Sequence, residues 1–284
     1  MKAIFTLNAL SPAEKSLLKV KQIQAEEPVQ QWIDLFTKMR DFDRQADRSR
    51  WWGGGMGCLG IILIIIGLPL ISIMVGIAMI PIGIIVAAVG LFIYFYLKPY
   101  DIQGEVLTVR VLPLLMILRE EMKPNEKLKL RLDLRGFEQP DKLTSQSPKR
   151  STAIYRSIID FYYRDHWMDG EATLADGTRL IWSVYDLVKH IKKIKYRKGK
   201  RKSKSKYRTS ISMQIGMSRK RYRLPPLKQK GTEGVIKTQK AGDYVWMLVK
   251  KTVKHPPGQS FQPNDLVNTI AAAYIRATPV GGGK

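Results

Sequence analysis

The longest uncharged stretch of this chain runs from Trp51 to Leu97 and contains no Lys, Arg, Asp, Glu or His. As one straight α-helix it would be roughly 70 Å long, because a helix rises about 1.5 Å per residue. The hydrocarbon core of a bilayer is only about 30 Å thick. The sequence therefore predicts a transmembrane helical hairpin at residues 51–98, which either spans the membrane twice or re-enters it.

The reversal of this hairpin is expected between Gly67 and Gly76, where Pro69 also disfavours a continuous helix. The two helices are then predicted near residues 54–70 and 76–97. Each is long enough to cross the hydrocarbon core, or nearly so, because a spanning helix needs about 20 residues.

Small residues recur along both predicted helices at spacings that place them on one face of each. Small side chains let helix backbones approach closely in lipid, where close packing drives association. The predicted seam of the hairpin consists of Gly60, Gly67, Gly76, Gly83, Ala87 and Gly90. The alternative is that glycine is simply frequent in membrane helices.

The segments before and after the hairpin are expected on the same side of the membrane, because both spanning twice and re-entering return the chain to its starting side. Basic residues gather in both flanks, at Lys38, Arg40, Arg44, Arg48, Arg50, Lys98 and Arg110. Short flanks rich in Lys and Arg remain in the cytoplasm. The sequence therefore predicts an integral membrane protein with two spans and both termini in the cytoplasm.

Residues 1–50 are predicted to form a helical N-terminal cytoplasmic segment. Ser11 and Glu14 have the spacing of a helix capping box, and Pro28 interrupts the helix, so two helical pieces are expected. The second piece has an apolar stripe at helical spacing, made of Val29, Trp32, Ile33, Phe36 and Met39. We expect this stripe to dock on the C-terminal domain, because nearby aspartates would be repelled by anionic lipid.

Residues 99–278 are predicted to form a basic, β-rich cytoplasmic domain, followed by a disordered tail at 279–284. Apolar and polar residues alternate over residues 127–134 and again over 207–218, which is typical of half-buried strands. Between these segments, the dipeptide that begins at Asp176 is Asp-Gly, which favours a tight hairpin turn.

Further strands are expected at residues 155–167, with the odd-numbered side chains sharing a face, and near 170–175. The returning strand places Leu180, Trp182, Val184 and Val188 on one face, and a last helix is expected to begin at Asn264 as its N-cap. The predicted fold class is an α+β membrane protein. A two-helix transmembrane hairpin is followed by an antiparallel β-rich domain, a sandwich or an open barrel, with flanking helices.

The formal net charge is +24, and the segment from Leu187 to Thr232 contains no Asp or Glu. The predicted polyanion-binding residues lie in the first half of this segment: Lys189, Lys192, Lys193, Lys195, Arg197, Lys198, Lys200, Arg201, Lys202, Lys204, Lys206 and Arg208. They are expected to form a loop-like arm with its tip at Gly199, disordered or splayed until an anion neutralises it. A solvated surface loop is the alternative.

The polyanion is expected to be the anionic lipid of the cytoplasmic leaflet, which attracts Lys and Arg near the membrane. Nucleic acid, including that of the ribosome, would use the same cations, and Tyr196, Tyr207 and Tyr222 could stack on its bases. No RNP-type or helix-turn-helix pattern accompanies these tyrosines. A protein partner is also expected.

A catalytic or metal site is not expected. His166 lies close to Asp165 and Asp169, but no Cys or His at metal-ligand spacing joins them. The residues around Gly199 depart from the phosphate-loop pattern, because Ile194 stands where its first glycine would be. The sequence therefore predicts a protein without enzymatic activity and without a cofactor.

Two classes of function follow from these features. The first is a membrane-anchored adaptor or scaffold, whose basic arm binds lipid headgroups or another polyanion, with a tether for nucleic acid or the ribosome as a variant. The second is a membrane receptor whose β-rich domain binds a small anionic ligand, such as a nucleotide. The adaptor predicts a filled sheet core and a projecting arm, whereas the receptor predicts basic side chains that converge in a cavity.

Overall fold

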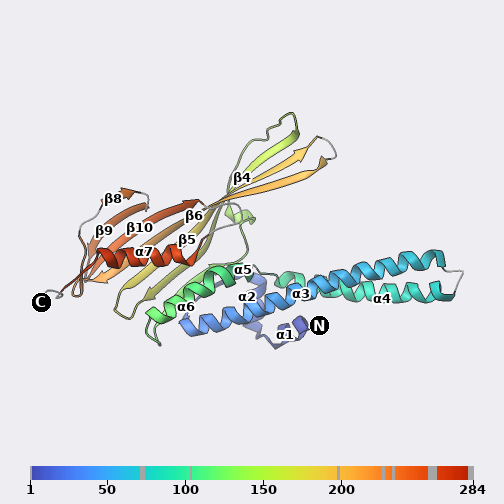
Figure 1. Ribbon diagram of the computed structural model, residues 1–284, viewed down its shortest axis with the longest axis horizontal. Helices are drawn as coiled ribbons and strands as arrows, with labels where there is room; N and C mark the ends of the chain where they lie inside the picture. Colours follow the sequence, from blue (N-terminus) through green and yellow to red (C-terminus); the bar gives the residue numbers. More distant parts are fainter. Residues whose placement is uncertain are drawn as a thin grey trace. The chain divides into compact units, whose positions relative to one another are not determined.

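The computed structural model describes residues 2–70, 74–102, 104–196, 199–225, 228–231, 234–254 and 261–280 (Figure 1). It combines helices with a large antiparallel sheet, so the fold class is α+β. The chain divides into two compact units. The first contains Met1–Lys21 and Leu35–Gly104, and the second contains Gln22–Asp34 and Glu105–Lys284.

Two short helices begin the first unit, α1 (Lys2–Ala9) and α2 (Pro12–Val20). The capping box predicted at Ser11 is confirmed. The Ser11 side chain accepts a hydrogen bond from the Glu14 amide at 3.2 Å, and the Glu14 carboxylate accepts one from the Ser11 amide at 2.8 Å. These bonds satisfy amide donors that a helix start would otherwise leave without partners.

The long helix α3 (Val29–Gly67) starts in the second unit and runs on through the first. Its 39 residues join the predicted cytoplasmic helix to the first hairpin helix without a break. A 3-10 turn (Leu68–Leu70) follows, and α4 (Met74–Leu97) returns alongside α3, with a second 3-10 turn (Lys98–Tyr100) after it. The reversal predicted between Gly67 and Gly76 is therefore confirmed, and residues 71–73 within it lie outside the described residues.

Two helical segments, Val29–Leu70 and Ile77–Tyr100, are long and apolar enough to cross a membrane. Their outward-facing side chains are large and apolar, with exposed fractions of 61% at Ile65, 63% at Ile85 and 61% at Phe92. Apolar surface this extensive marks an interaction site or a membrane-facing surface.

Glycines bring α3 and α4 into backbone contact. A Cβ atom added to Gly60 would meet backbone atoms of Gly83 and Ala87, and one added to Gly90 would lie 2.6 Å from the Gly53 carbonyl oxygen. Of the predicted seam, Gly60, Gly83, Ala87 and Gly90 are thus in the helix contact. Gly67 is buried at the last residue of α3, and Gly76 lies in the first turn of α4. The sequence analysis missed Gly53 and Gly57, which continue the same face toward the start of the hairpin.

Polar and aromatic contacts join the ends of the hairpin within the first unit. Arg50 on α3 forms ion pairs with Asp47 and with Asp101, the latter at 2.8 Å. The Phe42 and Tyr100 rings meet edge to face with centroids 6.4 Å apart. These contacts hold α3 against the segment that follows α4.

The second unit is built on one nine-stranded antiparallel sheet in the order β1-β2-β4-β5-β6-β10-β9-β8, with β3 paired to β4. The strands are β1 (Gln22–Pro28), β2 (Lys127–Asp133), β3 (Leu143–Gln146), β4 (Tyr155–Thr173), β5 (Arg179–Lys195), β6 (Arg201–Ser218), β8 (Lys228–Gly231), β9 (Gly234–Ala241) and β10 (Tyr244–Lys254). A separate pair joins β7 (Tyr222–Arg223) to β11 (Thr278–Pro279). In the part of the chain that the structure describes, the strands thus form one large sheet and one short pair, and not the two packed sheets of a sandwich.

Helices cover the apolar face of this sheet. A continuous helical segment comprises α5 (Gly104–Val106), a π-helical stretch (Leu107–Val111) and α6 (Leu112–Glu121), and α7 (Pro263–Arg276) ends the unit. Trp182, Val184 and the other even-numbered residues predicted on one face of β5 are buried, which confirms that prediction. The helices take the place of a second sheet because they bury the same apolar surface.

Three local predictions were wrong. Residues 22–28 form β1, which pairs with β2, although a helix was expected there. One strand, β4, replaces the two expected around residues 155–175. Just before a bulge between His166 and Met168 the odd-numbered residues of β4 are buried, and after it the even-numbered residues are buried. Gln262, not Asn264, caps α7, because Asp265 completes a capping box with it.

The apolar stripe at the start of α3 is buried, as expected. Its members Val29, Trp32, Ile33, Phe36 and Met39 are at most 7% exposed. The Trp32 indole donates a hydrogen bond to the Leu128 carbonyl of β2 at 3.0 Å. The first turns of α3 therefore dock on the sheet of the second unit.

Candidate anion-binding surface

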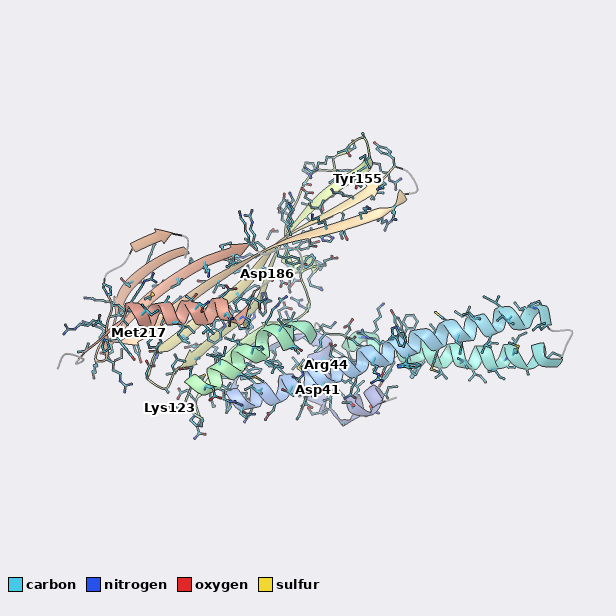
Figure 2. All side chains as sticks on the ribbon, viewed as in Figure 1. Asp41, Arg44, Lys123, Tyr155, Asp186 and Met217 are labelled. Carbon is cyan, nitrogen blue, oxygen red and sulfur yellow. The ribbon has the colours of Figure 1, made fainter. Side chains whose placement is uncertain are left out.

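Strands β4, β5 and β6 extend beyond the helix-covered part of the sheet and form an arm (Figure 1). We define the arm as residues 155–164, 187–195 and 201–208 of these strands. In Figure 2, Asp186 lies where the arm leaves the body of the sheet, Tyr155 lies toward its outer end, and Met217 lies at the opposite end of the sheet. The turn predicted at Gly199 is present, with φ at +56°.

The arm is not the disordered or splayed loop that its charge suggested. β5 and β6 pair continuously from Arg179 with Gly216 to Ile194 with Arg201. Along β6, from Lys202 to Arg208, Lys and Arg alternate with Ser and Tyr, so the cations can point to solvent on one side while the backbones bond to each other. Charge repulsion is thus outweighed by the hydrogen bonds and packing of a three-stranded ribbon.

The strand register places most of the cations on one face. Lys189 stands opposite Lys206, Lys193 opposite Lys202, and residues directly opposite in a ladder share a face. This surface, called the basic face below, carries Arg164, Lys189, Lys193, Lys195, Lys202, Lys204, Lys206, Arg208 and Lys254. Successive side chains of a strand point to opposite faces, and the even-numbered residues of β5 are the ones buried under the helices. The basic face, which carries the odd-numbered lysines of β5, is therefore opposite the helices.

Not all predicted cations belong to the basic face. Lys192 and Arg201 point to the other side of the arm, and Lys200 lies in the turn. Arg197 and Lys198 lie outside the described residues. The sequence analysis missed Arg164 and Lys254, which come from β4 and β10 and join the face only through pairing.

Aromatic rings support the cations of the basic face. Lys189 lies 5.3 Å from the centroid of the Tyr162 ring and Lys193 lies 5.2 Å from that of Tyr155. Of the tyrosines proposed for base stacking, Tyr207 is half-buried, with the Phe137 ring 5.9 Å away. Tyr222 donates a hydrogen bond to Asp176. The basic face therefore has its own aromatic residues, which the sequence analysis did not select.

The one acid in the three arm strands does not present its charge to solvent. Asp160 is 2% exposed, and its carboxylate accepts hydrogen bonds from Arg150 at 3.0 Å and pairs with Lys189 at 2.9 Å. The hydrogen bond to Asp160 also raises the pKa of Lys189. The exposed charge of the basic face is therefore positive throughout.

A groove of about 820 Å³ crosses the basic face where the arm meets the body of the sheet. Its cations are Lys189, Lys204, Lys206, Arg208 and Lys254, and Thr144 and Tyr162 also line it. An anion in this groove would meet several positive charges at once.

A network of buried charged side chains lies at the base of the arm, where the arm meets the body of the sheet, on the face opposite the basic face. The Lys142 ammonium donates hydrogen bonds to Asp165 at 2.6 Å and to the Gly136 carbonyl at 2.9 Å, and pairs with Asp133 at 3.2 Å. Arg135 binds the same Asp133 carboxylate through two nitrogens. Burial favours the neutral form of Asp133, but the hydrogen bonds from Arg135 and Gln22 and the charge of Lys142 together outweigh it and hold its pKa well below the usual range.

A second buried carboxyl, Asp186, lies beside this network. It is 6% exposed and accepts a hydrogen bond from the Thr209 hydroxyl. Burial raises the pKa of Asp186 to about 6, and the bond from Thr209 opposes this only in part. The folded chain thus binds a proton at Asp186 more tightly than the unfolded chain does.

The Asp186 carboxyl should make the folded state less stable as the pH rises. Below about pH 4 it is protonated in both states, and as the pH rises through about 6 the folded state must hold a buried charge. A rise of about two pKa units corresponds to roughly 3 kcal/mol. The variant Asp186→Asn should therefore gain about that much free energy of unfolding relative to the parent between pH 4 and pH 8, measured by urea titration. Parallel pH profiles of the two proteins would contradict this.

The histidine near two aspartates holds a structural position. His166 Nε2 lies 2.7 Å from Asp169 and 2.9 Å from the Ser183 hydroxyl, while Arg131 approaches Nδ1. Arg131 also donates a hydrogen bond to Asp169 at 3.0 Å, so these side chains form one polar cluster on the sheet. His190 bonds to Ser205, and His255 lies outside the described residues.

No protein-family model, curated protein or solved structure matches the chain.

Proposed function

We propose that this protein is a non-enzymatic, membrane-anchored adaptor whose basic face binds anionic lipid headgroups at the cytoplasmic side of a membrane. The observation that carries the proposal is the gathering of cations from four strands on one face whose single acid is buried and paired. Each Lys or Arg near an anionic membrane surface contributes about 1 kcal/mol. An array of cations that extends beyond the groove along the whole arm suits a surface of many headgroups better than it suits one enclosed ligand.

The hairpin of α3 and α4 is the proposed anchor. Two features support it: its length and apolar surface, and the basic flanks on either side. In this topology, both termini and the whole second unit lie in the cytoplasm, because the hairpin returns the chain to the side from which it entered.

The groove supports a second candidate, a receptor for a small anion that carries several negative charges. Lys204, Lys206, Arg208 and Lys254 line it together with Tyr162. Such a ligand would compete with vesicles for these cations. The receptor function is therefore tested with an inositol polyphosphate alone, and the adaptor function with vesicles alone. Nucleic acid would use the same cations, and its binding is tested in parallel by filter retention of RNA.

The adaptor is tested by removing three exposed charges, in the variant Lys202→Gln/Lys204→Gln/Lys206→Gln. The full chain is placed in phosphatidylcholine nanodiscs, and its binding to added phosphatidylserine vesicles is measured by flotation. At about 1 kcal/mol per cation, and 1.4 kcal/mol per tenfold change in affinity, the loss should approach about 100-fold. Moderate salt should weaken the parent in the same way, because it screens exposed charges.

The matched control removes the same charge elsewhere, in the variant Lys220→Gln/Lys237→Gln/Lys240→Gln, whose lysines are exposed and outside the arm. It should bind vesicles nearly as the parent does. Equal weakening by both variants would mean that net charge, and not the basic face, attracts the membrane. If the parent binds RNA but not vesicles, the lipid proposal is wrong.

A further inference from the structure

The end of the arm exposes two large apolar side chains next to each other. Ile154, just before β4, is 61% exposed, and Tyr196, just after β5, is 59% exposed. The Tyr196 amide donates a hydrogen bond to the Ile154 carbonyl at 3.3 Å, so the two residues are adjacent in space although far apart in sequence. We call this pair the arm tip.

Cations surround the arm tip. Lys195 precedes Tyr196, Arg156 follows Ile154 by two positions, and Lys200 and Arg201 follow the Gly199 turn. Isolated exposed apolar residues are common on protein surfaces. Here, however, two are paired near the outer end of a ribbon and are surrounded by positive charge.

We propose that the arm tip inserts Ile154 and Tyr196 into the boundary between headgroups and acyl chains of an anionic bilayer, while the surrounding cations bind the headgroups. This rests on the proposed function, since the basic face brings the arm to the membrane. Tyrosine suits this depth because its ring is apolar and its hydroxyl polar, and an isoleucine beside it adds aliphatic area.

A protein partner fits the arm tip less well. Specific protein interfaces bury about 800 Å² on each partner and involve 20 or more residues, whereas the tip offers two apolar side chains among repelling cations. A bilayer needs no matching pocket, because lipids rearrange around an inserted side chain. The positive ring also complements anionic headgroups directly.

Depth of insertion can be measured with one environment-sensitive fluorophore. Cys58 is the only cysteine in the chain, so Cys58→Ser gives a background without thiols. In that background, Ile154→Cys is labelled with a nitrobenzoxadiazole dye, and Tyr196 is kept. The control is Ile275→Cys on α7, where the native side chain is 85% exposed.

The full-length labelled chains are studied in nanodiscs with and without phosphatidylserine. The label at position 154 should shift to the blue, brighten several-fold and be quenched by a spin-labelled phospholipid when phosphatidylserine is present. The label at position 275 should stay in water in both lipids. A water-like signal at position 154 in both lipids, or equal quenching at both positions, would overturn insertion.

Substitutions test the same point without a label. Ile154→Ser/Tyr196→Ser, which leaves the charge unchanged, should weaken vesicle binding by at least tenfold, whereas Ile275→Ser should leave it nearly unchanged. All three side chains are exposed, so the melting temperature of each variant should match that of the parent. If the lysine-to-glutamine variant loses binding but the serine variant does not, the basic face binds lipid and the tip does not insert. If the parent binds no vesicle, both the proposed function and the insertion fail.

Discussion

Replacement of Lys142 by methionine is expected to lower the free energy of unfolding by about 3–5 kcal/mol, the usual cost of breaking a buried ion pair. The Lys142 side chain is 5% exposed, and all three of its ammonium protons have partners. Methionine has a similar shape but leaves the Asp165 carboxylate buried without its cation. Urea unfolding followed by circular dichroism measures the loss.

The effect of Lys142→Met should depend on pH. Burial already raises the pKa of Asp165, and Lys142 opposes that rise. Without the cation the pKa of Asp165 rises further. The variant should therefore be least stable relative to the parent above that pKa, and the difference should shrink as the pH falls below it and Asp165 takes up a proton. Addition of Asp165→Asn should restore part of the stability at pH 7.

The control for this prediction is Lys149→Met, which removes a lysine that is exposed in the same connecting segment. Exposed charges contribute little to stability, so the change should stay within about 0.5 kcal/mol. Losses of similar size at both positions would show that the Lys142 network does not stabilise the arm base.

The second large effect is expected at the contact between α3 and α4. In Gly60→Ala/Gly90→Ala, each added methyl would lie less than 3.0 Å from backbone atoms of the facing helix. Backbone cannot move aside as a flexible side chain can, so the helices must separate. Overpacking of this kind costs about 1–3 kcal/mol at each site, and the melting temperature of the detergent-solubilised protein should fall.

The matched control adds the same two methyls on α3 away from the contact, in Gly54→Ala/Gly55→Ala. A Cβ at Gly55 meets nothing within 4 Å, and one at Gly54 is 4.0 Å from the Tyr94 ring. Alanine favours a helix over glycine by up to about 1 kcal/mol per residue, so this variant should be as stable as the parent or more so. A lower melting temperature in both variants would mean that the helix contact is misplaced.

Local pattern sufficed for much of the fold. The alternation over residues 127–134 is β2, the Asp-Gly dipeptide at Asp176 is the turn between β4 and β5, and the Ser11 capping box begins α2. The helix reversal near Pro69 was predicted as well. Each of these depends on residues that are neighbours in the chain, or on one periodicity, and these are properties that a sequence displays directly.

Long-range pairing decided the rest. Residues 22–28 are mostly polar and acidic, and their alternation is limited to Ile23 and Ala25, which is too short to predict a strand. They form one by pairing with β2, about a hundred residues later. The sequence predicted that the basic residues would repel each other, but not that β4 and β5 would hold them in a ladder.

The sequence by itself determined that a charge-free segment turns back on itself, that a strand-rich domain follows, and that one segment concentrates the positive charge. It could not determine which cations share a face. Arg164 and Lys254 join the basic face, and Lys192 leaves it, because strand register and the alternation of side chains assign each residue to one side of the sheet. Register is set by hydrogen bonds between distant residues, so only the tertiary structure could show where the charge is presented.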